Sequence, residues 1–237
     1  MSSANQAVPD DLANQDPEAI SAMFGRVAPR YDLMNHAMGA GIDIYWRWKL
    51  ARAVRAQRPA RILDLATGSG DVLLALHKQR AFTELAAGAD FCLPMLRLAR
   101  SKKAVNLLAS DGLRLPFPAA AFDAVTIAFG LRNFADRLAG LREMRRVLRP
   151  GGRAYILEFS HPVAWLAPAY FWYMRAIMPK YSRLFTPEEG AYKYLGESIK
   201  AFLPQPKLAG MMVEAGFSKA DWTNFALGIV ALHVAEV

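Results

Sequence analysis

The sequence predicts an α/β domain built around a mostly parallel sheet. Short apolar runs alternate with longer helical segments from about Arg61 to Phe159, and this alternation is typical of a doubly wound sheet. A Gly-x-Gly turn, Gly68-Ser69-Gly70, follows the first apolar run. The chain has 237 residues, a length that suits one domain with a sizeable core. These three observations together favour a single α/β unit.

Each expected strand is a short apolar run bounded by polar or turn-forming residues. The alternating region predicts strands at residues 61–65, 85–89, 105–110, 122–129 and 153–159. Helices are predicted between them at 71–78, 93–100 and 136–148, and Pro150-Gly151-Gly152 is a strong stop signal for the last one. Two final strands, 217–222 and 228–234, are predicted to form a hairpin on the sheet edge. The expected sheet therefore has seven strands.

The segments before and after the alternating region have a different pattern. Residues 1–18 are polar and are predicted to be a disordered tail, whereas residues 19–56 read as largely helical. Residues 164–185 are unusually aromatic, and helices are predicted after them at 192–202 and 207–215. We interpret residues 19–237 as one domain with helical N-terminal additions and a helical lid inserted at about 164–205.

Composition excludes several classes of protein. No apolar stretch is long enough to span a bilayer, and the first residues lack a signal-peptide pattern. Cys92 is the only cysteine, so neither an intramolecular disulfide nor a cysteine-based zinc site is expected, and no cluster of metal ligands appears. A cytoplasmic protein is expected. The net charge of +8 suits nucleic acid, anionic lipid or a merely basic surface, so charge alone does not decide the partner.

The turn from Asp64 to Asp71 is the first candidate ligand site. Gly68 and Gly70 lie between a predicted strand and a predicted helix, where glycine allows positive φ and close approach of a ligand to the backbone. The helix N-terminus beyond them offers free N–H groups. Taken alone, this pattern is equally typical of an ordinary turn. Leu73 replaces the third glycine of the dinucleotide fingerprint, which counts against NAD.

Acidic residues lie at or just after the ends of three predicted strands, at Asp64, Asp90 and Asp111. A carboxylate at the second strand end suits ribose hydroxyls. Asp111 could accept a hydrogen bond from an adenine amino group, with Gly112 leaving space for the ring, although it is equally typical of a turn or helix cap. Asp64 would repel phosphates and attract an amino-acid ammonium. S-adenosylmethionine has an ammonium, a sulfonium and a ribose but no phosphate, so this acidic pattern favours it as the ligand.

Longer blocks extend well beyond this turn. The most specific are Arg30-Tyr31-Asp32-Leu33-Met34-Asn35 and Phe129-Gly130-Leu131-Arg132-Asn133. Further blocks are Ile62–Asp71, Gly88–Phe91, Leu115–Phe117, Arg146–Gly152, Leu157–Ser160, Tyr192–Leu195 and Gly228–His233. In these blocks the chain resembles the quinone-biosynthesis C-methyltransferases that make menaquinone and ubiquinone, from about Met23 to His233. The resemblance implies a Rossmann-like class I methyltransferase fold, with S-adenosylmethionine contacted by Ser69, Asp90 and the Asp111-Gly112 pair.

The chain departs from this family at a few positions. Gly39 and Asp43 stand before Trp46, where the family often has a Ser and a His. Ala128 replaces a cofactor-binding serine of the fourth strand, which removes one hydroxyl, and Ser69 stands where threonine is common. These departures leave the cofactor assignment in place and bear mainly on the substrate pocket.

The implied reaction moves a methyl group from the sulfonium to a ring carbon of a reduced quinone. Such a transfer needs in-line alignment and a quinol hydroxyl that is deprotonated or polarised, and it needs no metal. Arg132, Tyr31 and Asp32 are the candidate catalytic residues, with Glu158 and His233 as further candidates for the proton step. Three of these residues have a structural alternative: an ion pair for Arg132, a helix cap for Asp32 and core packing for His233.

Demethylmenaquinol is the expected substrate, and the polyprenyl benzoquinol of ubiquinone biosynthesis is the alternative. Methylation of another small molecule or of RNA is less favoured, no nucleic-acid partner is expected, and a non-catalytic sensor fits the many family blocks least. The aromatic segment Trp165–Tyr181, with Arg175, Lys180 and Arg183, fits a lid packed on the sheet. It also fits peripheral contact with the membrane that holds a polyprenyl substrate. The sequence does not predict the oligomeric state.

Overall fold

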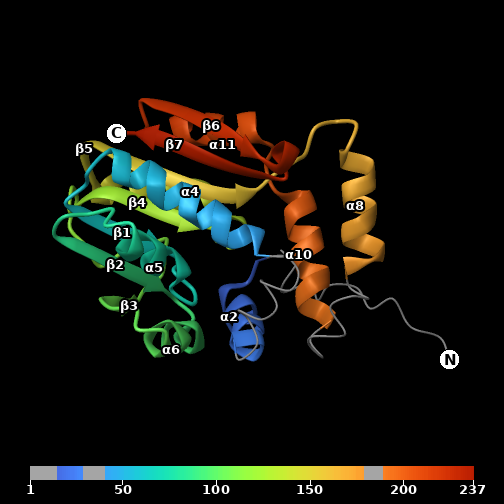
Figure 1. The fold of residues 1–237 in the computed structure, drawn as a ribbon, viewed down its shortest axis with the longest axis horizontal. Coiled ribbons are helices and arrows are strands. Elements are labelled where there is room, and N and C mark those ends of the chain that lie inside the picture. Colours follow the sequence, from blue (N-terminus) through green and yellow to red (C-terminus); the bar gives the residue numbers. More distant parts are fainter. Residues whose placement is uncertain (1–14, 29–40, 179–188) are drawn as a thin grey trace.

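A single seven-stranded sheet organises the protein (Figure 1). The computed structural model describes residues 15–28, 41–178 and 189–237. The strands lie in the order β3-β2-β1-β4-β5-β7-β6. Their bounds are β1 Arg61–Leu65, β2 Leu85–Asp90, β3 Leu107–Ala109, β4 Phe122–Ala128, β5 Leu148–Phe159, β6 Lys219–Phe225 and β7 Val230–Glu236. The predicted mostly parallel sheet of seven strands is confirmed.

Strand pairing places a ligand site at one edge of the sheet. β1 pairs in parallel with β2 on one side and with β4 on the other, so the strand order reverses at β1. In open α/β sheets, ligands bind outside the carboxyl ends of the strands at such a reversal. Only β7 runs antiparallel to its neighbours β5 and β6 among the strands described, as expected for the predicted terminal hairpin.

Helices cover both faces of the sheet and form two cores. α4 (Ile42–Ala56), α5 (Asp71–Lys78) and α6 (Leu93–Ser101) lie on one face, and α7 (Arg137–Val147) and α11 (Gln205–Glu214) lie on the other (Figure 1). Leu50 of α4 and Leu76 of α5 pack with Ile62 of β1 in the first core. Met144 of α7 and Met212 of α11 belong to the second core. The amphipathic helices thus bury their apolar sides against a sheet that is apolar on both faces.

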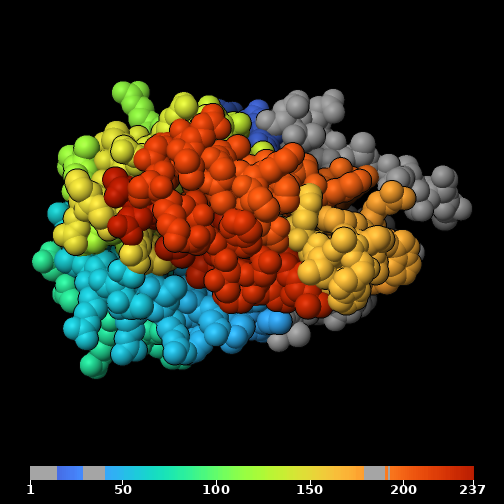
Figure 2. Space-filling view, turned by 90° about the horizontal axis from the view of Figure 1, so that it is seen from above, coloured from blue at the N-terminus to red at the C-terminus, as the bar shows by residue number. Residues whose placement is uncertain are grey.

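A third group of helices lies beyond the carboxyl ends of the parallel strands (Figure 1). It consists of α2 (Pro17–Val27), α8 (Ala167–Ala176) and α10 (Glu189–Ala201). Val27, Met174, Met178 and Ile199 form an apolar cluster between these helices. Seen from above, α8 forms one end of the molecule, away from the sheet (Figure 2). This group stands next to the sheet edge at which the strand order predicts a ligand.

Several strands have other bounds than predicted, including β6 and β7, which each begin two residues later. β5 begins at Leu148 rather than Arg153, so Pro150-Gly151-Gly152 lies inside the strand. The register shifts between Phe122 and Ala124 on β4, and Gly151 takes φ of 74°, so the strand accommodates the stop signal as an irregularity. The third strand covers only Leu107–Ala109, because only these residues pair with β2.

The predicted disordered tail is wrong at its C-terminal end. α2 begins at Pro17, and the Asp16 carboxylate caps it by accepting a hydrogen bond from the Glu18 N–H at 2.9 Å. Gln15 donates from Nε2 to the backbone carbonyl of Arg132 at 2.8 Å. Residues 1–14 lie outside the described residues. So do Gly39 and the block 30–35, which contains the catalytic candidates Tyr31 and Asp32.

Candidate active site

The glycine-rich turn after β1 is shaped by close packing on one side and an open cleft on the other. Gly70 has φ of 79°, and a Cβ there would lie 2.9 Å from the Ala104 Cβ and 3.0 Å from the Ala99 Cβ. Gly68 has φ of 55°, and a Cβ there would meet only the end of Met95, at 3.5 Å. Gly70 therefore lets α5 approach α6, whereas Gly68 leaves backbone accessible to a ligand.

A third glycine of the dinucleotide fingerprint would let α5 pack closely on the sheet. Here a glycine of β2, Gly88, provides that room instead. Leu73 is fully buried, and a Cβ at Gly88 of β2 would lie 2.6 Å from its Cδ1. The Leu73 side chain thus fills the gap over Gly88. Helix α5 stays close to the sheet although the helix itself lacks that glycine.

Asp64 lies beneath the turn rather than in the cleft. Its side chain is fully buried, and the hydroxyls of Thr67 and Thr126 donate to its two oxygens, each at 2.6 Å. Burial raises the pKa of Asp64 to about 7, against the lowering effect of these two hydrogen bonds. The carboxyl group therefore shapes the turn, and Thr67 stands between it and a ligand in the cleft.

Asp90 presents its carboxylate at the cleft. Its Oδ2 accepts a hydrogen bond from the Gly68 N–H at 2.8 Å, and its Oδ1 accepts one from the Cys92 N–H, also at 2.8 Å. Burial raises its pKa, while these backbone hydrogen bonds oppose the rise. The two N–H groups fix the carboxylate and leave further lone pairs for ligand hydroxyls.

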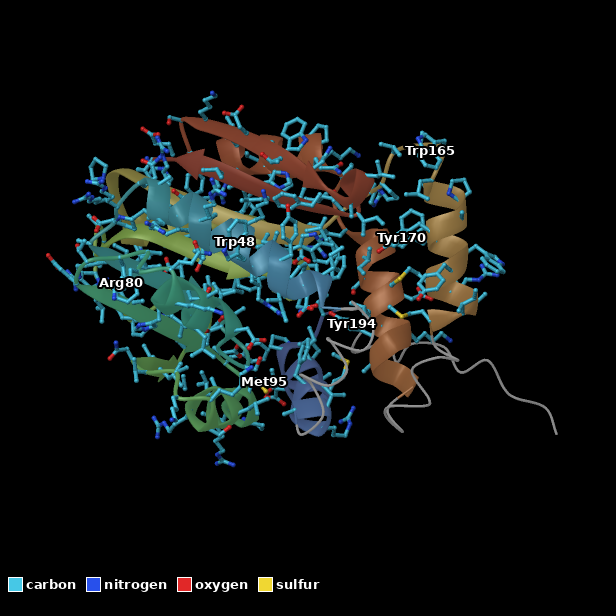
Figure 3. All side chains as sticks on the ribbon, viewed as in Figure 1. Trp48, Arg80, Met95, Trp165, Tyr170 and Tyr194 are labelled. Atoms are coloured by element: carbon cyan, nitrogen blue, oxygen red, sulfur yellow. The ribbon has the colours of Figure 1, made fainter. Side chains whose placement is uncertain are left out.

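The cleft lies between α2, α6 and the carboxyl ends of β1, β2 and β4. Met95, labelled in Figure 3, lies where α6 faces α2. The lining residues are Ile20, Phe24, Ala66, Gly68, Asp90, Phe91, Cys92, Met95, Ala128, Phe129, Gly130, Asn133 and Phe134. Apolar walls around one fixed carboxylate suit an adenosine group, whose ring is flat and whose ribose carries hydroxyls. Ala128, which replaces the family's serine, is part of this lining.

Ser69, Asp111 and Gly112 lie near the cleft without lining it. The Ser69 hydroxyl donates to an Asp71 oxygen at 3.1 Å. Asp111 is exposed, and one of its oxygens accepts a hydrogen bond from the Leu113 N–H at 2.8 Å. The space beside Gly112 is filled, because a Cβ there would lie 2.6 Å from the Phe134 ring. The expectation that Gly112 leaves room for adenine is therefore wrong in this structure, because Phe134 occupies that room.

Asp43, the departure from the family pattern in the front segment, takes part in a charge network. It pairs with Arg47 at 2.5 Å, and Arg47 lies 3.7 Å from Asp71 at the start of α5. Lys102 makes an ion pair with the same Asp71. These charges tie α4 and α6 to the N-terminus of α5, so Asp43 helps to hold the helices that frame the turn.

A second polar cluster occupies the ends of β4 and β5. Arg132 donates from Nη1 to Glu158 Oε1 at 2.8 Å, and its backbone N–H donates to Oε2 of the same carboxylate at 3.2 Å. Both side chains are buried. The Arg132 Nε is buried and has no hydrogen-bond partner among the described residues. The ion-pair interpretation of Arg132 is thus correct.

Asn133 and Tyr194 join this cluster to α10. The Tyr194 hydroxyl donates to Asn133 Oδ1 at 2.9 Å. Burial raises the pKa of Tyr194, against the lowering effect of nearby Arg132 and Arg137, so the phenol remains a donor. With its oxygen engaged, the Asn133 amide has its N–H₂ group available to the cleft that it lines. In Figure 3, Tyr170 of α8 points toward α10, and burial also raises its pKa.

Sequence reasoning did not single out Asn133 or Tyr194. Both lie inside blocks that carried the family resemblance, so position within those blocks was the available signal. His233 was a candidate for the proton step, but it is buried in β7, with its Nε2 3.1 Å from the Gln205 carbonyl oxygen and its ring stacked on Trp222. Burial lowers the pKa of His233 to about 4. This placement supports the packing interpretation of His233.

Comparison with known proteins identifies the family. The ubiE/COQ5 methyltransferase family matches residues 12–236.

The chain belongs to the ubiE/COQ5 methyltransferase family.

It is therefore an S-adenosylmethionine-dependent methyltransferase. A relative from Thermus thermophilus, named demethylmenaquinone methyltransferase, is 45% identical over 220 residues, which cover 90% of this chain and 99% of the relative. Relatives of the same name from Deinococcus radiodurans and Mycobacterium tuberculosis are 44% and 43% identical. The first covers 92% of each chain, and the second covers 93% of each.

Solved structures confirm the Rossmann-like methyltransferase fold. A SAM-dependent methyltransferase from Thermotoga maritima aligns with a TM-score of 0.63 at 16% identity, over 91% of this chain and 98% of that chain. One from Aquifex aeolicus aligns with a TM-score of 0.52 at 20% identity, over 75% and 81%. Within residues 15–28, 41–178 and 189–237, no group of three or more His, Cys, Asp or Glu side chains is placed to hold a metal. No helix in the same ranges is long and apolar enough to cross a membrane.

Proposed function

We propose that the protein methylates a ring carbon of demethylmenaquinol in menaquinone biosynthesis, with S-adenosylmethionine as the methyl donor. The observation that carries this substrate is the 43–45% identity to relatives named demethylmenaquinone methyltransferase, over nine-tenths of the chain or more. The residues at the cleft support the donor, because a fixed carboxylate, apolar walls and an exposed glycine backbone suit adenosine better than a phosphate-bearing cofactor.

The turn and the strand ends would hold the donor. Asp90 would accept hydrogen bonds from the ribose hydroxyls, and the Gly68 backbone would lie against the methionine portion. We keep Ser69 and Asp111 as proposed contacts, since Asp111 has one oxygen that Leu113 does not engage. Asp64 would act through Thr67, and Gly70 through the packing of α5. Bound S-adenosylmethionine supplies an electrophilic methyl group on a sulfonium.

The cluster beyond β4 and β5 would act on the acceptor. A quinol ring carbon becomes nucleophilic when a neighbouring hydroxyl loses its proton, and the resulting phenolate needs stabilisation. The Nε of Arg132, which has no partner among the described residues, and the amide N–H₂ of Asn133 are donors suited to that oxygen. Glu158 would keep Arg132 in place. From the family resemblance, Tyr31 and Asp32 are proposed to complete the site from the front segment.

A polyprenyl tail would require an apolar path beside the cleft. Phe24 lines the cleft and also packs on the apolar cluster of Met174, Met178 and Ile199 between α8 and α10. We infer that these two helices form a lid over the acceptor and that the tail passes along their apolar surfaces. The protein would then work as a cytoplasmic enzyme at the inner face of the membrane that contains its substrate.

Methyl transfer from labelled S-adenosylmethionine tests the proposal directly. Purified protein is expected to label demethylmenaquinol in preference to the polyprenyl benzoquinol of ubiquinone biosynthesis. Faster labelling of the benzoquinol would assign the alternative substrate. Labelling of total RNA with neither quinol labelled would overturn the proposal. The lipids of a strain that lacks the gene provide an independent check, because the accumulating quinone is the physiological substrate.

A further inference from the structure

Helix α8 carries apolar side chains on its solvent side as well as on its inner side, and Arg175 is its one charged residue. Its sequence is Ala-Pro-Ala-Tyr-Phe-Trp-Tyr-Met-Arg-Ala. Met174 and the following Met178 face inward and pack with Val27 and Ile199. A helix that is hydrophobic all round is normally covered on all sides. The outer side of α8 therefore lacks the cover that its composition calls for.

Large aromatic side chains dominate that outer side. Trp165 is 75% exposed and Trp172 is 63% exposed, and Ile177 after the helix is 39% exposed. In Figure 3, Trp165 lies at the end of α8 that is farthest from the cleft helices. Exposed apolar groups gathered in this way mark an interaction surface rather than ordinary surface variation.

The exposed surface continues onto the turn between β6 and β7. Leu227 is 56% exposed and lies in the short helix η3 (Ala226–Gly228). Its carbonyl oxygen accepts a hydrogen bond from the Val163 N–H at 2.9 Å, and Val163 is itself exposed. Leu227 adopts φ of 56°, a conformation that is costly for a leucine. We call Val163, Trp165, Trp172, Ile177 and Leu227 together the α8 face.

Exposed aromatics elsewhere are covered differently. On α4, Trp48 stacks with Tyr45, and the charges of Lys49 and Arg52 lie 5.6 Å and 5.4 Å from the Trp48 ring. In the part of the chain that the structure describes, neither Trp165 nor Trp172 has a ring or cation partner of this kind. No aromatic ring or cation of the described residues therefore covers these two indoles.

The charged residues of the segment that contains α8 are all basic. From Phe159 to Thr186 the sequence contains no Asp or Glu. Arg175 on α8 is exposed, and the whole chain carries a net charge of +8. Such a surface attracts anionic headgroups. A second copy of the same face would bring the two Arg175 side chains toward each other, which disfavours a symmetric dimer here.

We propose that the α8 face docks on the surface of an anionic lipid bilayer. Tryptophan favours the boundary between headgroups and acyl chains, because its ring is apolar and its N–H is polar. The ten residues of α8 are too few to span a bilayer, so the helix would lie in the interface plane. The inference rests on the proposed function in one respect: a membrane-dissolved quinol gives the docking its purpose.

Docking through this face would bring the cleft to the source of the acceptor. The inner side of α8 packs against α10 and α2, and Phe24 of α2 lines the cleft. In Figures 1 and 3, α8 is the outermost element at the carboxyl edge of the sheet. A polyprenyl chain leaving the bilayer under α8 would therefore meet the apolar cluster before reaching the polar residues of the site.

Vesicle sedimentation of the full-length protein tests the docking. The probes are vesicles of phosphatidylcholine alone and vesicles of phosphatidylcholine and phosphatidylglycerol in equal amounts. The double variant Trp165→Ser/Trp172→Ser is expected to lose about tenfold in partitioning onto the mixed vesicles, because two apolar side chains no longer enter the interface. The matched control is Trp48→Ser, which removes an exposed indole from α4 and should sediment like the wild-type protein.

A charge variant separates electrostatic attraction to anionic lipid from non-specific hydrophobic binding. Arg175→Glu is expected to weaken sedimentation with the phosphatidylglycerol vesicles and to leave the weak binding to phosphatidylcholine unchanged. Circular dichroism and binding of S-adenosylmethionine should be the same for all variants, since the substituted side chains face outward. A double variant that sediments like the wild type would overturn the docking, and so would a wild-type protein that ignores both kinds of vesicle.

Methyl-transfer assays keep this inference distinct from the proposed function. The double variant should methylate a water-dispersed quinol without a prenyl chain as the wild type does, and should be slow only with prenylated quinol held in vesicles. If the wild type methylates neither quinol, the proposed function fails whatever the vesicle result. If light scattering shows a wild-type dimer that the double variant abolishes, with vesicle binding unchanged, the α8 face is a contact between copies and the proposal is wrong.

Discussion

Asp64 and Asp90 end neighbouring strands of the sheet, yet their carboxyl groups meet different partners. Two threonine hydroxyls surround Asp64 beneath the turn, whereas backbone N–H groups hold Asp90 at the cleft. Hydroxyls can donate to a carboxylate or accept from a carboxylic acid, so the Asp64 site tolerates a proton. Two N–H groups can only donate, so they oppose the rise that burial causes in the pKa of Asp90.

Replacing Asp90 by Ala is expected to weaken S-adenosylmethionine binding by about 1–3 kcal/mol, because ribose hydroxyls would lose their acceptor. Titration calorimetry measures the change. Asp221→Ala is the matched control, since Asp221 is exposed on β6 and pairs only with Lys219 among the described residues. The control should bind as tightly as the wild type. Equal affinities for the Asp90 variant and the wild type would remove Asp90 from the cofactor site.

Asp64 is expected to make stability depend on pH. Its pKa is about 7 in the folded protein against 3.8 ordinarily, so the folded state holds a proton that the unfolded state releases. The stabilisation is complete below the ordinary pKa and is lost as the pH rises through about 7. From about pH 5 to about pH 8, the free energy of unfolding should fall by about 3 kcal/mol through this group.

Asp64→Asn removes this ionisation and should flatten that part of the pH profile. Urea unfolding at the two pH values measures the slope for both proteins. The exposed Asp221→Asn variant, expected to keep the wild-type slope, serves as the control. An Asp64→Asn protein whose unfolding free energy falls as steeply as that of the wild type would contradict the assignment.

At the level of elements, the packing of α5 on the sheet depends on the Leu73 side chain filling the space that Gly88 leaves. Gly88→Ala should cost about 1–3 kcal/mol through overpacking, and Leu73→Ala should cost about 2–5 kcal/mol through the cavity that it leaves. The double variant should cost less than the sum, because each change makes room for the other. Chemical denaturation gives the three values. Strict additivity would show that the two side chains do not share one space.

The order and type of the elements were predictable because each has a local cause. Apolar runs marked the strands. Helix α7 was predicted at 136–148, and it runs from Arg137 to Val147 with Asp136 as its N-cap. The start of β5 was not predictable, because Pro150-Gly151-Gly152 is locally a loop signal. Backbone hydrogen bonds from the Gly151 N–H to the Val237 carbonyl and from the Val237 N–H to the Gly152 carbonyl continue the sheet there. Tertiary pairing overrides a local signal there.

The candidate site was predictable where position along a strand decides function. Asp90 at the end of β2 and the Gly68 backbone follow from strand order alone. The surroundings of Gly112 do not follow from strand order, because the Phe134 ring that fills the space beside it comes from a distant part of the chain. A second glycine, Gly140, also borders that ring. The Tyr194–Asn133 hydrogen bond likewise joins α10 to the end of β4. No pattern within either segment reports such a contact.

At the scale of the whole molecule, ligand binding should stabilise the fold in a way that separates the donor from a dinucleotide. Anything that binds only the folded state raises the free energy of unfolding, by about 2.7 kcal/mol at one hundred times its Kd. S-adenosylmethionine is expected to show this rise in urea unfolding, whereas NAD at the same concentration should show none. An equal rise with NAD would contradict the interpretation that the acidic residues of the cleft favour a ligand without phosphate.

The position of β7 also constrains how the protein is made. β7 follows β6 in the chain but lies between β5 and β6, pairing with both from Val230 to Glu236. During synthesis, β6 therefore leaves the ribosome with no neighbour to join, and the outer edge of β5 stays unpaired until β7 arrives. An open edge of this kind invites pairing with other chains. The sheet is therefore most exposed to pairing with other chains until β7 has inserted between β5 and β6.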